Sequence, residues 1–155
     1  MPSRTSPRRT TGERGAAMVE FAIVLPLMVV LVFGTIDIGR AYMAWNQVKG
    51  AAREGAGYAQ FFPNRATNVG ICVDPDNVRF KALQEGDGDT TSYSVSTKRV
   101  DPPQSTITCG GTAVPPGAKV RVTVSQPFEV ITPIASRLVG NPLVISASVE
   151  VVVQG

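Results

Sequence analysis

The 155-residue chain contains no histidine and only two cysteines. Without histidine it cannot build a Ser-His-Asp or Cys-His nucleophile system, and two cysteines alone cannot complete a structural zinc site. It also has no phosphate loop with a lysine, no dinucleotide-binding glycine pattern, and no basic strip interleaved with aromatic residues. We therefore expect no catalytic residue, no cofactor, no metal ion and no nucleic-acid partner. A small enzyme is the least favoured class of function.

The net charge of +3 is confined to one short segment. Residues 1–15 hold four arginines and one glutamate, whereas residues 16–155 hold eleven basic and eleven acidic side chains. The first fifteen residues are rich in Arg, Ser, Thr, Pro and Gly, a composition that cannot bury an apolar core. We expect a disordered basic arm, followed by a body with no net side-chain charge.

A long apolar run follows the basic arm. Residues 16–36 carry one charge, Glu20, and as a helix would extend about 31 Å, close to the hydrocarbon thickness of a bilayer. Pro26 lies inside the run, where membrane helices tolerate proline better than soluble helices do. We interpret the run as a single membrane span surrounded by lipid. The arginines of the arm favour a cytoplasmic N-terminus and an extracytoplasmic C-terminal domain.

Apolar and small residues continue at helical spacing beyond the apolar run. They predict that the helix extends to about residue 60 and that its second half projects into water. The small side chains near its end leave the rod thin, so another element can pack closely against it. The predicted face consists of Ile38, Tyr42, Trp45, Val48, Ala52, Gly55, Ala56 and Ala59.

Charged residues on this projecting half could form ion pairs. Asp37 and Arg40 stand three residues apart, a spacing at which helical side chains meet, and could pair at the membrane edge. Arg53 could pair with a carboxylate of the C-terminal domain. Such pairs contribute a few tenths of a kcal/mol, about the value of exposed salt bridges in general.

The remainder of the chain is typical of β-structure. Residues 119–125 alternate strictly between apolar and polar side chains, residues 145–153 do so apart from Val152, and residues 93–100 alternate more weakly. Residues 133–138 could form one helical turn between the two strong strands. We therefore predict an α+β, pilin-like fold in which a long N-terminal helix, membrane-spanning in its first half and projecting in its second, packs on a small antiparallel β-sheet.

Three segments are expected from this pattern. They are a basic leader over residues 1–15, a membrane-anchoring helix over 16–60, and an extracytoplasmic β-rich domain over 61–155. Pro63 and Asn64 supply the signal that ends the helix.

Both cysteines, Cys72 and Cys109, lie in the β-rich domain beside turn-forming residues. An even number of cysteines in a small extracytoplasmic domain favours a disulfide, with two free buried thiols as the alternative. Closing this loop of nearly forty residues would stabilise the domain by about 3–4 kcal/mol. Two acidic clusters, at residues 74–77 and 85–89, do not follow the spacing of a calcium-binding loop and are interpreted as solvated turns.

The junction between the arm and the apolar run has an unusual order of residues. Gly15 and Ala16 are followed by three further small or apolar residues, then by Glu20 and Phe21. An ionised glutamate at the start of a membrane helix is costly without a partner. This junction resembles the type IV prepilin processing site in the form found in Flp-type, or tight adherence, pilins. The resemblance implies that an aspartic prepilin peptidase cuts between Gly15 and Ala16.

Three further motifs follow the junction. They are Leu25-Pro26-Leu27, Gly39-Arg40 and Ala51-Ala52-Arg53-Glu54-Gly55-Ala56. With these motifs, residues 12–59 resemble the TadE-like family of pilin-like proteins. Many members continue the last motif with Arg-Tyr-Ala, whereas here Gly57 stands in place of that arginine. The resemblance implies a minor pilin, pseudopilin or assembly factor of a tight adherence type IV pilus or related secretion filament. The implied partners are prepilin peptidase, other pilins and the pilus assembly platform in the inner membrane.

Cleavage after Gly15 would give Glu20 a specific role. The new positive amine on Ala16 would lie about one helical turn from Glu20. In a filament, Glu20 of one subunit could pair with the Ala16 amine of a neighbour, and Glu20 and Phe21 would then set the register between subunits. Alternatively, Glu20 lies at the headgroup level of an ordinary anchor.

A plain membrane anchor is the competing interpretation of the whole chain. The protein would then be a single-pass, membrane-anchored extracytoplasmic binding domain outside any filament, with the arm and apolar run acting as an ordinary signal sequence. Cleavage near Gly34 would, however, sever a helix whose pattern continues to Ala59. This continuity, with Glu20 at the start of the run, favours the pilin-like interpretation.

Overall fold

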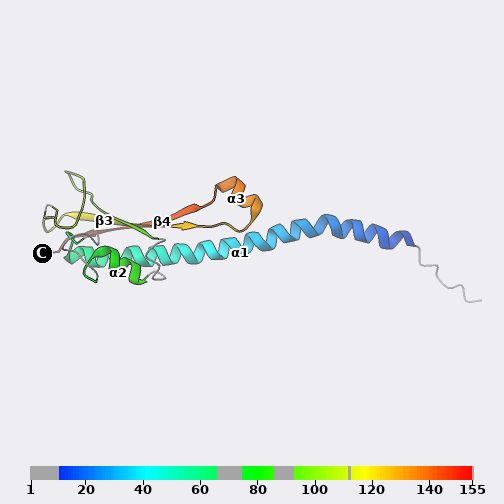
Figure 1. Cartoon of the computed structure of the whole chain (residues 1–155), viewed down its shortest axis with the longest axis horizontal. Coiled ribbons are helices and arrows are strands. Elements are labelled where there is room, and N and C mark those ends of the chain that lie inside the picture. The colour runs from blue at the N-terminus through cyan, green and yellow to red at the C-terminus, as the bar shows by residue number, and fades with distance from the viewer. Residues whose placement is uncertain (1–10, 66–74, 86–92, 112, 155) are drawn as a thin grey trace, which may run out of the picture.

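The computed structural model describes residues 11–65, 75–85, 93–111 and 113–154. The molecule is a long helical rod with a small sheet laid along one half of it (Figure 1). The predicted α+β architecture, a long N-terminal helix packed on a small antiparallel sheet, is confirmed. In chain order the elements are α1 (Thr11–Phe61), α2 (Val78–Glu85), β1 (Ser94–Arg99), β2 (Ser105–Thr106), β3 (Lys119–Phe128), α3 (Pro133–Val139) and β4 (Leu143–Val152).

The rod is one uninterrupted helix, α1, of 51 residues with Pro26 inside it. It ends at Phe61, close to the predicted end. It begins at Thr11, so the prediction of a disordered arm is wrong for residues 11–15, while residues 1–10 lie outside the described part of the chain. The helix extends into the arm because adding a residue to an existing helix costs little, and no proline stands between Thr11 and Pro26.

The sheet has four antiparallel strands in the order β2-β1-β3-β4. The three predicted strands correspond to β1, β3 and β4, and the two-residue β2 was not predicted. In β3 the predicted alternation holds, because Val120 and Val122 are fully buried while Lys119 and Arg121 are exposed. The register with β4 places Val122 opposite Val149 on the inner face of the sheet.

Two short helices complete the fold. The predicted turn at residues 133–138 is α3. α2 was not predicted, because its two turns are too few for a helical period to stand out beside the acidic turn residues that precede it. Asn77 caps this helix, its side-chain oxygen accepting a hydrogen bond from the Phe80 N–H at 2.8 Å.

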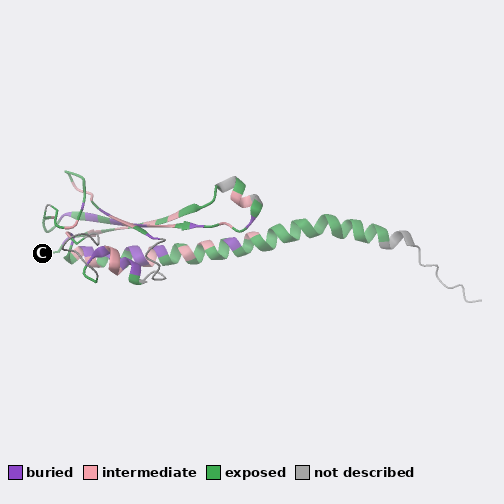
Figure 2. Ribbon diagram, viewed as in Figure 1, coloured by how far each residue is buried: buried purple, intermediate pink, exposed green. Residues whose placement is uncertain are grey.

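The hydrophobic core lies between the second half of α1, α2 and one face of the sheet (Figure 2). The prediction that small residues let another element approach α1 closely agrees with the structure, since five of them are buried there. The residues after β4 also contact α1, because the Gln154 N–H donates a hydrogen bond to the Gln60 carbonyl at 2.9 Å. The buried small residues of α1 are Ala51, Ala52, Gly55, Ala56 and Ala59.

The predicted apolar face of the projecting half is correct only from Val48 onward. Ile38 and Tyr42 remain 72% and 63% exposed, and Trp45 is also exposed. In this stretch the sheet lies against a different side of α1, which buries Asp37 and half-buries neighbouring alanines. The helical period alone could not reveal which side the sheet would cover.

Candidate functional site

The predicted processing and register residues lie at the bare end of α1. Gly15, Ala16, Glu20 and Phe21 are all helical and all exposed. Among the described residues, Glu20 takes part in none of the ion pairs or hydrogen bonds. The structure therefore places these four residues near one end of the rod and leaves the Glu20 carboxylate available to a group outside the subunit.

The first half of α1 is apolar and has no protein covering it (Figure 2). Large side chains such as Met18, Phe21 and Ile23 are more than three-fifths exposed. Of the described helices, α1 alone is long and apolar enough to cross a membrane, and its most apolar stretch is wholly uncovered. Such a surface needs lipid or other apolar chains around it, because contact between apolar side chains and water is unfavourable. The helix is compatible with single-pass membrane anchoring.

The second half of α1 is fitted closely to the rest of the domain at Gly55. A side-chain carbon added at this position would lie 3.0 Å from the Ala82 Cβ on α2 and 3.3 Å from the Val122 Cγ1 on β3. Glycine is therefore favoured here by the close approach of three elements rather than by an unusual backbone angle. Its neighbours Arg53 and Glu54 are exposed, and no ion pair of Arg53 with the β-rich domain occurs among the described residues. The proposed partner of Arg53 is thus not seen.

A buried carboxylate, Asp37, connects the middle of α1 to the end of the sheet. It is the first residue beyond the apolar run and is only 8% exposed. Its two oxygens accept hydrogen bonds from the backbone N–H groups of Ile131 at 3.1 Å and Thr132 at 2.8 Å. The predicted pair with Arg40 is confirmed, with 3.3 Å between Asp37 Oδ1 and the guanidinium. Asp37 thus serves chiefly as a cross-link between distant segments.

The environment of Asp37 favours its charged form. The pKa of its carboxyl lies below the ordinary value of 3.8, because the Thr132 hydroxyl and the Thr132 N–H stabilise the carboxylate. The hydroxyl contributes by proximity, since it falls short of a fully formed hydrogen bond. The Ile131 N–H and Arg40 lower the pKa further, while burial acts in the opposite direction. A group with a lowered folded-state pKa contributes stability above its unfolded pKa and loses it as the pH falls through the folded value.

Replacing Asp37 with alanine is expected to release residues 131 and 132 from α1. Their backbone N–H groups would lose their acceptors, and hydrogen exchange at these two amides should accelerate about tenfold or more. Acidification below pH 3.8 should progressively produce the same change in the unaltered protein. Glu54→Ala, which removes an exposed carboxylate from the same helix, is the control. Equal exchange rates in the Asp37 and Glu54 variants would show that the cross-link does not hold the segment.

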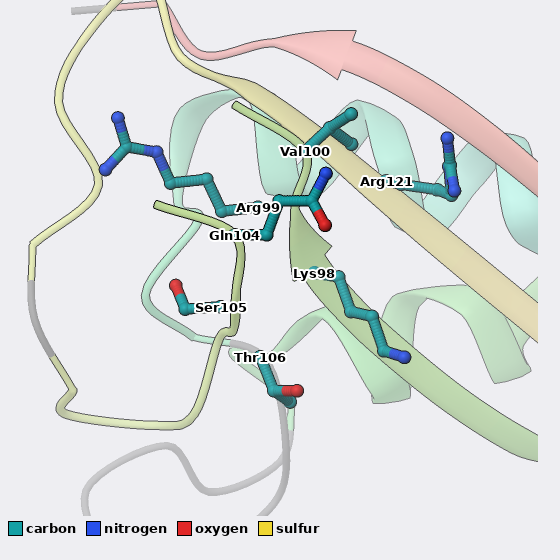
Figure 3. Close-up of a pocket in the computed structure, with 7 residues that line it drawn as sticks. All are labelled: Lys98, Arg99, Val100, Gln104, Ser105, Thr106 and Arg121. Carbon is teal, nitrogen blue, oxygen red and sulfur yellow. The ribbon is translucent and has the colours of Figure 1, made fainter. Parts of the chain in front are cut away.

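A polar hollow of about 290 Å³ lies at the end of the sheet far from the bare half of α1. Three basic side chains line it, but Figure 3 shows Arg99 extending away from Lys98 and Arg121. Arg121 is also paired with Glu150 across the strands, with 2.8 Å between Arg121 Nε and the carboxylate. Because the basic groups diverge and one is neutralised, the hollow does not form a built anion site.

Cys109 lies in the described part of the chain, and Cys72 does not. Among the described residues no cysteine is free, and Cys109 is in the disulfide form. Cys72 lies outside the described residues, so its pairing stays a prediction. Of the acidic turns, Asp74, Asp87 and Asp89 also lie outside the described residues.

A known protein family is similar to most of α1. Residues 15–57 match a family model described as TadE-like protein. This part of α1 is similar to TadE-like proteins. The match begins at the predicted cleavage site, includes Glu20, Asp37 and Gly55, and ends before the β-rich domain. No curated protein and no solved structure matches the chain.

The similarity of this segment to TadE-like proteins indicates a protein associated with the Tad pilus. The departure at Gly57 falls on an exposed position, where an added side-chain carbon would have no neighbour within 4 Å. The fold of this domain therefore does not depend on an arginine at position 57.

Proposed function

We propose that the protein is a minor pilin or pseudopilin subunit, or an assembly factor, of a tight adherence type IV pilus or related secretion filament. Residues 1–15 act as a leader that prepilin peptidase removes after Gly15. The N-terminus lies in the cytoplasm and the β-rich domain outside it. The partners are the peptidase, other pilins, the assembly platform in the inner membrane, and membrane lipid.

One observation carries this proposal: a single helix joins an uncovered apolar half to a half built into the core of a folded domain. A disposable signal sequence would not need to share a continuous helix with the domain it exports. Here a cut near Gly34 would separate the anchor from Asp37, less than one turn further along, and from Gly55, about six turns further along. Removal after Gly15 takes only the first residues of α1 and leaves its uncovered apolar half joined to its covered half in the mature chain.

The free carboxylate of Glu20 supports a role in assembly. After cleavage, the amine of Ala16 and the carboxylate of Glu20 would be two opposite charges in an apolar stretch. Each is expensive to keep unpaired in a membrane or a filament core. Pairing between neighbouring subunits would neutralise both charges only at one relative shift of the two subunits along the filament axis. Phe21 would pack beside the pair. Glu20 and Phe21 would thereby fix subunit register.

The mature N-terminus tests the proposal most simply. A chain that begins with Ala16 supports prepilin processing. A chain that retains its arm would instead favour the single-pass anchored binding domain, and so would one that begins near Thr35 after cleavage by signal peptidase.

We further propose that Cys72 and Cys109 form a disulfide with each other. Trypsin digestion without reductant should release peptides 66–79 and 100–119 as one linked species that separates on reduction. Cys72→Ser, Cys109→Ser and the double variant should each lose the same free energy of unfolding, about 3–4 kcal/mol, because each removes the same bond. Two free thiols in protein isolated from the cell envelope, or effects that simply add in the double variant, would contradict the bond.

A further inference from the structure

The segment that joins β3 to β4 extends from the sheet toward the bare half of α1 (Figure 1). It comprises residues 129–142 and contains α3. Together with the first two residues of β4, Leu143 and Val144, we call it the α3 tip. Figure 1 shows α3 lying where the sheet-covered half of α1 gives way to the uncovered half. The tip therefore lies at the level where the apolar run ends.

Hydrogen bonds hold the α3 tip at this level. Asp37 accepts the N–H groups of Ile131 and Thr132, and Arg40 donates to the Glu129 carbonyl at 3.3 Å. The Arg40 guanidinium also stacks on the Phe128 ring, 5.2 Å from its centre. Because Asp37 directly follows Ile36, the last residue of the apolar run, these contacts place the tip beside the predicted membrane surface.

The α3 tip presents apolar side chains that the protein leaves uncovered. Val144 is 66% exposed and Ile131 is 52% exposed, and Leu143, which precedes Val144 in the chain, is also exposed. Val144 belongs to the outward-facing set of β4, and the next outward residues along the strand are Ser146, Ser148 and Glu150. The apolar end of this face nearest the apolar run is thus separated by polar residues from Val152, which is 48% exposed at the other end of the strand. The exposed charges of the tip, Arg137 and Glu129, offset each other.

We propose that the α3 tip rests on the lipid bilayer, with Ile131, Leu143 and Val144 at the boundary between headgroups and acyl chains. The proposal rests on the membrane placement of α1 given above. An apolar patch of a few side chains beside a membrane helix gains burial by entering this boundary, and its nearly balanced charge leaves apolar contact as the main attraction. The tip and α1 then form a two-point contact with the membrane that sets the tilt of the domain while the subunit is in the bilayer.

Tryptophan reporters in the full-length protein can test this contact. In a Trp45→Phe background, Val144→Trp places a reporter on the tip. Ser148→Trp is the matched control, because it is exposed on the same face of β4 but lies about 13 Å farther along the strand. Leu27→Trp places a reporter in the middle of the apolar run. Each protein is reconstituted in phosphatidylcholine vesicles that carry bromine at either a shallow or a deep position of the acyl chain.

The three reporters separate this inference from the membrane placement on which it depends. Quenching at position 144 by shallow bromines, at least about threefold stronger than at position 148, is the expected result, together with deep quenching at position 27. Deep quenching at 27 with equal, weak quenching at 144 and 148 would overturn the tip contact alone. Absence of quenching at 27 would overturn the membrane placement and the tip contact together.

A second copy of the chain is the other candidate to cover the tip. If so, the fluorescence at position 144 would shift only at high protein density in the vesicles, and bromine quenching would fall as density rises, which would overturn lipid contact. Adding Ile131→Asp to the Val144→Trp protein should return quenching at 144 to the level seen at 148. Native-like near-ultraviolet circular dichroism of this variant would show that the exposed substitution leaves the domain folded.

Discussion

Glu20→Ala is expected to abolish incorporation of the protein into filaments while leaving membrane insertion and cleavage after Gly15 intact. Glu20 is exposed and takes part in no ion pair among the described residues, so its loss removes nothing that holds the domain together. Within a filament the same change would leave the neighbour's Ala16 amine unpaired in apolar surroundings. An unpaired buried charge costs about 3–5 kcal/mol, which corresponds to a loss of two to three orders of magnitude or more in the association constant.

Three measurements on one set of cells distinguish this result from a general defect. Resistance to alkaline extraction reports insertion, the mass of the chain reports cleavage, and the amount in the sheared filament fraction reports incorporation. Glu20→Gln keeps the shape of the side chain without its charge and should fail in the same way, whereas Glu54→Ala removes an exposed carboxylate elsewhere on α1 and should behave as the unaltered protein. Normal incorporation of the Glu20 variants would refute a register role.

Gly55→Val is expected to destabilise the domain by about 2 kcal/mol. The first added carbon already lies 3.0 Å from the Ala82 Cβ and 3.3 Å from the Val122 Cγ1. Valine adds two further methyl groups at this close approach of α1, α2 and β3, so we expect α2 or β3 to move. The loss exceeds the few tenths of a kcal/mol that valine gains over glycine in a helix. For a domain of this size, the midpoint of thermal unfolding should fall by roughly 5–10 °C or more.

The matched control is Gly57→Val, two residues further along the same helix. An added side-chain carbon there would have no neighbour within 4 Å, so this change should leave the midpoint unchanged or raise it slightly. Thermal unfolding of the full chain in detergent, followed by near-ultraviolet circular dichroism, reports packing of the domain rather than the helicity of α1. If the two valine variants unfolded at the same temperature, the close approach at Gly55 would not matter for stability.

Local patterns in the sequence were sufficient for much of the fold. The strict alternation through Val120, Val122 and Val124 gave both the position of β3 and its buried face, since a period of two leaves no alternative. The small residues of α1 likewise marked where the rod is covered, because only small side chains allow close helix–sheet contact. The spacing of Asp37 and Arg40 identified a pair that the structure contains.

Features that depend on distant partners could not be predicted in the same way. The partners of Asp37 are backbone N–H groups 94 and 95 residues away, and no side-chain pattern marks them. α2 has only two turns, so no helical period distinguishes it in the sequence. Asn77, which caps α2, therefore looks from the sequence like one of the acidic turn residues beside it. Ile38 and Tyr42 matched the helical period of the buried face but remain exposed, because the sheet covers the side of α1 that carries Asp37.

At the proposed processing site, family similarity and position in the structure agree. The TadE-like family model matches from Gly15 onward, and the structure leaves Gly15 and Ala16 exposed near the end of the rod. The same exposed apolar helix would also serve a simple anchor. Only the covalent fate of the first fifteen residues separates a processed pilin-like subunit from an anchored domain.

The most direct test is therefore the N-terminal sequence and intact mass of the protein isolated from membranes of cells that make the prepilin peptidase. The account predicts a chain that begins with Ala16, and a chain of unprocessed length when the peptidase is absent. A chain that retains residues 1–15 in the presence of the peptidase, or one that begins near Thr35, would contradict the account.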